Sequence, residues 1–128
     1  MGDVAANVNW TAVAVGTVVS FVLGWLWYSP ALFGKKWAAG VGVDLGSAQN
    51  VPVAALVTQL AATFSLAWLI GVAVGRHGFV FDVLIVAMPV LFIVSNGMFA
   101  KKSGYAIAVE AGFIVAMGLV MNVVQAVL

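Results

Sequence analysis

The chain has 128 residues, of which 65% are hydrophobic and 7% are charged; its net charge is +1 and it has no cysteine. A soluble domain carries about 25% charged residues, and a small domain in water still exposes much of its surface. The composition therefore excludes a soluble fold and indicates that the solvent is a lipid bilayer. The weak net charge excludes a basic nucleic-acid interface, and the lack of cysteine excludes disulfides, thiol catalysis and cysteine-ligated metals.

Four apolar runs predict an all-α integral membrane protein with four transmembrane helices in a single domain, residues 1–128. The first run follows a potential N-cap, Asn9, and about 20 residues at about 1.5 Å each match the roughly 30 Å of a hydrocarbon core. Proline, glycine and charged residues mark the ends of the runs. The helices are expected at residues 10–29, 53–75, 79–100 and 105–128.

The link over residues 31–51 is the longest connection in the chain. It carries Phe33 and Trp37 beside Lys35 and Lys36. Aromatic rings next to lysines are typical of the boundary between lipid and water. We therefore expect this link to lie in the interface and not free in water.

Lysines set the expected orientation. The first and third loops share one side of the membrane and hold Lys35, Lys36, Lys101 and Lys102, whereas the second loop holds Arg76. The positive-inside rule places the lysine loops in the cytoplasm and both termini outside.

Two segments of the sequence resemble each other. Residues 29–36 align with residues 95–102, with the serine, the phenylalanine and both lysines identical. Each segment closes an odd-numbered helix, so the pattern predicts two helical hairpins in the same orientation, a parallel pseudo-repeat of the kind found in transporters. Coincidence between apolar segments with similar loops is the alternative explanation.

Small residues recur at spacings that suit close helix packing. Gly16, Ser20 and Gly24 form a ridge along the first helix, and Gly71 and Gly75 form a GxxxG pattern in the second. Since four helices enclose little volume, we expect a homo-oligomer that uses these faces. A chance abundance of small residues is the simpler explanation.

Glu110 is the main candidate for chemistry, because it is the only acidic residue well inside a predicted span. An ionisable group at membrane depth is costly and marks a functional site by default. Gln59, Asn96, Tyr28 and Ser29 lie at a similar level of the other helices. Together these residues predict a polar layer near the cytoplasmic side that contacts an ion, a proton or a polar substrate.

The structural alternative is that Glu110 fixes the helix register. Burial favours a neutral carboxyl group, which would hydrogen-bond to Gln59 or Asn96. The side chain also has the length to reach Lys101 or Lys102 at the membrane surface.

Interfacial anchoring explains most of the aromatic and basic residues. No nucleophile, base and acid occur together, and one histidine, His77, does not make a metal site. We therefore expect no enzymatic activity, no metal and no cofactor. The expected anchors are Trp27, Tyr28, Trp37, Lys35, Lys36, Lys101 and Lys102.

Two motifs resemble a known family. Leu26-Trp27-Tyr28-Ser29-Pro30 is followed by Phe33-Gly34 and Trp37, and Glu110-Ala111-Gly112-Phe113 lies in the last helix. Over nearly the whole chain this pattern resembles the bacterial membrane family called domain of unknown function 1761. The resemblance implies four transmembrane helices in a bacterial cell (inner) membrane, and it implies no established activity.

Two functional classes follow from these observations. The first is a small oligomeric transporter or channel with Glu110 in its polar layer. The second is a non-catalytic accessory subunit that binds another membrane protein or lipid.

Overall fold

The computed structural model describes residues 5–43, 53–74 and 76–128, and over these residues the regular structure is entirely helical. Four of the five helices are long and apolar enough to cross a membrane. Their ends lie within two residues of the predicted ones. The helices are α2 (Trp10–Trp27), α3 (Gly34–Val41), α4 (Val53–Ala73), α5 (Phe79–Phe99) and α6 (Gly104–Val127).

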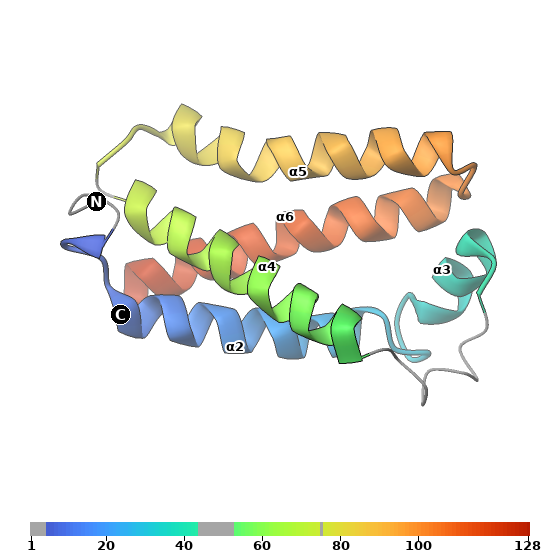
Figure 1. Ribbon diagram of the computed structural model, residues 1–128, viewed down its shortest axis with the longest axis horizontal. Helices are drawn as coiled ribbons and strands as arrows, with labels where there is room; N and C mark the ends of the chain where they lie inside the picture. Colours follow the sequence, from blue (N-terminus) through green and yellow to red (C-terminus); the bar gives the residue numbers. More distant parts are fainter. Residues whose placement is uncertain (1–4, 44–52, 75) are drawn as a thin grey trace.

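The four long helices run alternately in opposite directions, and α3 lies at the end of the bundle where α2 and α5 finish (Figure 1). α6 is the centre of the packing, because α2, α3, α4 and α5 all contact it. The core between α2, α4 and α6 contains Val13, Ile70, Phe113, Met117 and Met121, all almost fully buried. α5 packs mainly on α6 and makes a smaller contact with α4.

Small residues let the helices approach one another inside this bundle. A Cβ atom at Gly16 would lie 3.5 Å from Met121, and one at Gly24 would lie 3.0 Å from the Phe113 ring. Ser20, between them on α2, is fully buried. The ridge on α2 therefore faces α6 of the same chain.

Gly71 is also used within the chain, since a Cβ there would lie 3.0 Å from both Val13 and Gln125. Gly75, the second member of the predicted GxxxG pattern, lies outside the described residues. The expectation that the ridge on α2 and Gly71 join protomers is therefore wrong, because neighbouring helices of the same chain already cover them. An oligomer has to use other surfaces.

The link after α2 contains a helix that the sequence pattern did not predict. α3 has only eight residues, too few for a recognisable hydrophobic period. The two similar segments consequently differ in structure. Residues 29–33 form a turn that leads into α3, whereas residues 95–99 are the last part of α5.

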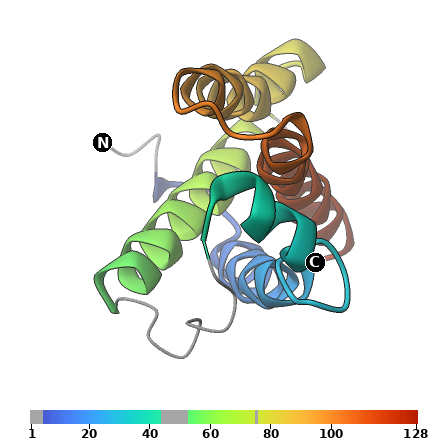
Figure 2. The same cartoon turned by 90° about the vertical axis from the view of Figure 1, so that its right-hand side faces the viewer.

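α4 is covered along only part of its length. Every residue from 53 to 62 is exposed, whereas Thr63, Ala67 and Ile70 further along are buried. The end-on view shows this first half of α4 diverging from the other helices (Figure 2). About three turns of an apolar helix are thus left without cover from their own chain.

The contact between α5 and α6 provides a test of this packing. A Cβ at Gly118 would lie 2.7 Å from Val86 on α5. Gly118→Leu is expected to lower the free energy of unfolding by about 1–3 kcal/mol, because overfilling a packed site forces the helices apart. Unfolding in detergent, followed by circular dichroism, measures the change.

Val115→Leu is the matched control, since it adds volume to α6 at an exposed position. Adding Val86→Ala to Gly118→Leu makes room and should restore part of the lost stability. Equal effects of the two leucine substitutions would contradict the described packing.

Candidate functional site

The candidate site begins where α2 ends. Pro30 follows Ser29, whose hydroxyl donates to the Leu26 carbonyl over 2.7 Å. The Ser29 carbonyl in turn accepts from the Gly34 amide over 2.9 Å. A Cβ atom at Gly34 would overlap the carbonyl oxygen of Tyr28. The turn therefore needs glycine at this position, and it directs the chain back across the bundle end as α3.

Aromatic side chains hold α3 in this place. The rings of Trp27 and Phe33 have centroids 4.8 Å apart, and Tyr28 meets Trp37 edge to face at 4.9 Å. Phe113 of α6 joins both pairs, at 6.0 Å from Trp27 and 5.5 Å from Tyr28. Aromatic pairs at these distances stabilise by about 0.5–1.5 kcal/mol beyond the burial of their area.

Hydrogen bonds attach the end of α2, and α3, to α6 and the turn before it. Trp27 Nε1, at the end of α2, donates to the Val109 carbonyl of α6 over 3.0 Å. The Ser103 amide donates to the Gly40 carbonyl over 3.0 Å. The Ser103 hydroxyl meanwhile caps α6 by accepting from the Ala106 amide, also over 3.0 Å. A side chain on Gly40 would overlap Ser103, so glycine permits the close contact.

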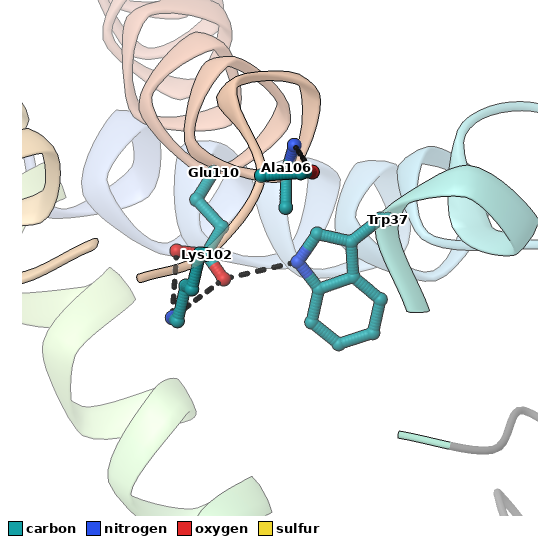
Figure 3. A network of polar contacts seen from close by, with 5 residues as sticks. Trp37, Lys102, Ala106 and Glu110 are labelled. Carbon is teal, nitrogen blue, oxygen red and sulfur yellow. Dashed lines mark hydrogen bonds and ion pairs between the residues drawn. The ribbon is translucent and has the colours of Figure 1, made fainter. Parts of the chain in front are cut away.

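The Glu110 carboxylate lies at the centre of this arrangement (Figure 3). Lys102 Nζ lies 3.1 Å from Oε1 and 3.0 Å from Oε2, and Trp37 Nε1 donates to Oε2 over 3.0 Å. The side chains of Lys102 and Glu110 are 28% and 17% exposed. A half-buried ion pair of this kind costs desolvation but keeps each charge compensated. One carboxylate thus joins α3, α6 and the turn before α6.

Tyr28 lies at the edge of the site, one residue beyond the end of α2. Burial, and then the nearby Glu110 carboxylate, raise the pKa of the Tyr28 phenol above its ordinary value. Both causes disfavour a second negative charge. The phenol therefore stays protonated at physiological pH.

The structure brings together only some of the residues predicted for the polar layer. Glu110 and Tyr28 are neighbours. Gln59 on α4 and Asn96 on α5 are exposed, and neither is among the hydrogen-bond partners of Glu110. Ser29 bonds to the backbone of its own turn. The expectation that all four long helices contribute to one layer within a chain is therefore wrong, and the alternative partner Lys102 is the one that Glu110 contacts.

The predicted anchors divide into two groups. Trp27 and Trp37 use their indole N–H groups for contacts inside the chain, and Lys102 binds Glu110. Lys35, Lys36 and Lys101 are exposed.

Two residues of the site escaped the sequence analysis. Gly40 and Ser103 carry the backbone contact between α3 and α6. A serine just before an apolar run is a recognisable N-cap signal and identifies Ser103. Nothing in the sequence distinguishes Gly40 from the other glycines of the link. Within the described residues, no group of three or more acidic or histidine side chains is placed to hold a metal ion.

The fold and site define a small all-helical protein with four helices of membrane length and a charged cluster at one end of the bundle. Residues 11–126 match the family model described as "Protein of unknown function (DUF1761)". The chain therefore belongs to the DUF1761 family, as its two motifs indicated. No curated protein and no solved structure matches the chain.

The hydrogen bond from Trp37 allows a sharp test of how α3 is held. Trp37→Phe keeps a ring beside Tyr28 but removes the donor to Glu110. A hydrogen bond to a charged group contributes about 1.5–3 kcal/mol, so the amides of residues 35–41 should exchange with deuterium at least about tenfold faster.

Trp25→Phe is the control, because Trp25 on α2 is 71% exposed and lies outside this cluster. Hydrogen exchange read by mass spectrometry compares the two variants with the parent chain. Unchanged exchange in Trp37→Phe would show that α3 is held without this bond.

Proposed function

We propose that the chain is a multi-pass protein of a bacterial cell membrane, with the lysine-bearing end of the bundle in the cytoplasm and both termini outside. The length and apolar character of α2, α4, α5 and α6 support the membrane placement. The four lysines at one end support the orientation. The alternating directions of the helices suit two like-oriented hairpins, α2 with α4 and α5 with α6 (Figure 1).

Within this membrane protein, Glu110 forms the working site of a small oligomeric transporter or channel. The observation that carries this proposal is the carboxylate itself, held inside an apolar helix by Lys102 and Trp37. A charge at this depth is costly, and membrane proteins keep such groups mainly for ions, protons or polar substrates. The remaining exposure of both side chains leaves the pair open to exchange.

The mechanism is competition for the carboxylate. A proton or a cation that reaches Glu110 takes the place of the Lys102 ammonium group. Lys102 is then released towards water, and the Trp37 hydrogen bond becomes weaker when Glu110 is neutral, because its acceptor no longer carries a negative charge. Because Trp37 belongs to α3 and Glu110 to α6, binding at the carboxylate changes how firmly α3 is attached.

The path for such a substrate runs between protomers. Gln59 lies about 9 Å along α4 from its start, on a stretch where all residues from 53 to 62 are exposed. An amide facing hydrocarbon is unfavourable unless it finds a hydrogen-bond partner. A second copy covering this part of α4 would supply that partner and join Gln59 to the site.

A second candidate is a non-catalytic subunit that binds another membrane protein or lipid. The observation in its favour is that Lys102 and Trp37 already satisfy the Glu110 carboxylate within the chain. Glu110 would then serve only to fix α3 on α6. The exposed half of α4 would contact the other protein.

Glu110→Gln separates the two candidates. The chain is reconstituted in liposomes, and proton flux under a potassium diffusion potential is followed with a pH-sensitive dye. Parallel assays use Na⁺ and a lipophilic organic cation as probes. If Glu110 is the working site, the variant loses at least about tenfold in flux, while native mass spectrometry finds the same homo-oligomer as for the parent chain.

Asp82→Asn is the matched control, since it neutralises the acidic residue in the first turn of α5 at the opposite end of the bundle. It should leave the flux unchanged. Absence of flux for every probe in the parent chain, or loss of assembly in Glu110→Gln, would overturn the transport proposal. A fixed complex with a different membrane protein would support the second candidate.

A further inference from the structure

Positive charge is concentrated at one end of the bundle. Four of the five basic residues, Lys35, Lys36, Lys101 and Lys102, belong to the connections at this end. Among the described residues, Glu110 is the one acidic residue at this end, so the described charges there sum to about +3 at neutral pH, where Lys is protonated and Glu is ionised. In the part of the chain that the structure describes, the opposite end carries Arg76 in the turn before α5 and Asp82 in the first turn of α5. The chain is thus electrically polarised along its long axis.

The four lysines differ in their exposure and in their contacts. Lys102 turns inward and its charge is compensated by Glu110. Lys35, Lys36 and Lys101 are exposed, and within the described part of the chain none of them makes an ion pair. Lys36 Nζ instead lies 5.3 Å from the centre of the Tyr105 ring at the start of α6. Over residues 5–43, 53–74 and 76–128, no carboxylate therefore neutralises these three ammonium groups, and all three side chains lie at the surface.

The position of α3 determines where these lysines lie along the long axis of the bundle. Gly34 and Ala38 are the buried residues of α3, so its other side faces outward. Figure 2 views the bundle from the end at which α3 lies, in front of the long helices. The contact between Gly40 and Ser103 ties α3 to the first residues of α6. The exposed lysines consequently lie where the long helices end, which is the level of lipid headgroups.

Apolar groups accompany the lysines on this surface. Leu32, just before α3, is 47% exposed, and Phe99, beside Lys101, is 85% exposed. A surface for soluble phosphate compounds or nucleic acid would gain nothing from such side chains in water. Lysines with exposed apolar neighbours at one level match the boundary between phosphate headgroups and acyl chains.

We propose that Lys35, Lys36 and Lys101 form a binding surface for anionic phospholipid headgroups. The ammonium groups contact the lipid phosphates, while Leu32 and Phe99 contact the upper acyl chains. This surface rests on the membrane placement proposed above and is independent of transport through Glu110. Its occupant is a lipid class, distinguished from neutral phospholipids by charge alone.

The test measures lipid retention by the intact chain in detergent. Native mass spectrometry follows binding of phosphatidylglycerol and, separately, of phosphatidylcholine with the same acyl chains. The parent chain should prefer phosphatidylglycerol. Each of Lys35→Gln, Lys36→Gln and Lys101→Gln should reduce the apparent affinity for it by about fivefold, as expected for one lysine at an anionic surface, with little change for phosphatidylcholine.

Two controls keep the result interpretable. The triple Lys→Arg variant retains the charge and should retain phosphatidylglycerol, which separates electrostatic binding from a change in folding. Inorganic phosphate at equal ionic strength should not displace the lipid, because it lacks the acyl chains. Equal retention of the two lipids by the parent chain, or full retention by the triple Lys→Gln variant, would overturn the proposal. A parent chain that carries no flux but still prefers phosphatidylglycerol would contradict the transport proposal and leave the lipid proposal standing.

Discussion

The ion pair between Glu110 and Lys102, with the bond from Trp37, is the constraint on which this end of the molecule depends. A carboxylate on an apolar helix requires compensation of its charge. Lys102 provides it from the turn before α6, and Trp37 provides it from α3. Because those partners belong to different elements, compensating one charge also fixes the relative positions of α3, α6 and the turn before α6. The aromatic pairs of Tyr28 with Trp37 and Phe113 lie beside this contact.

Along the length of the bundle, the long helices approach one another at small residues. α6 lies against α2 where Gly16 and Gly24 remove the side chains that would hold Met121 and Phe113 away, and against α5 through Gly118. In lipid, helices gain little from burying apolar groups, so close approach supplies the attraction. α6 and α2, which make most of these contacts, are the best covered of the four long helices. The first half of α4 has no such contact with the bundle and is exposed throughout.

The sequence predicted the long helices to within two residues, because length and apolar composition decide which segments cross a bilayer. It did not predict which side of α4 or α5 faces inward. In a soluble helix the polar side identifies the outer face, but here apolar residues surround each helix and that signal is missing. Gln59 and Asn96 were therefore assigned to an inner layer, although both are exposed. α3 was missed because eight residues among glycines show no period.

The two motifs singled out in the sequence are brought together by this fold. The first supplies the turn after α2, with Trp27, Tyr28 and Gly34, and then Trp37; the second supplies Glu110 and Phe113. Residues some 73–82 positions apart in the chain thus form one unit. Since that unit holds α3, it also sets the level of Lys35 and Lys36. Trp37 couples Glu110 to α3, which carries Lys35 and Lys36, whereas Lys101 follows α5 and is not held by this unit.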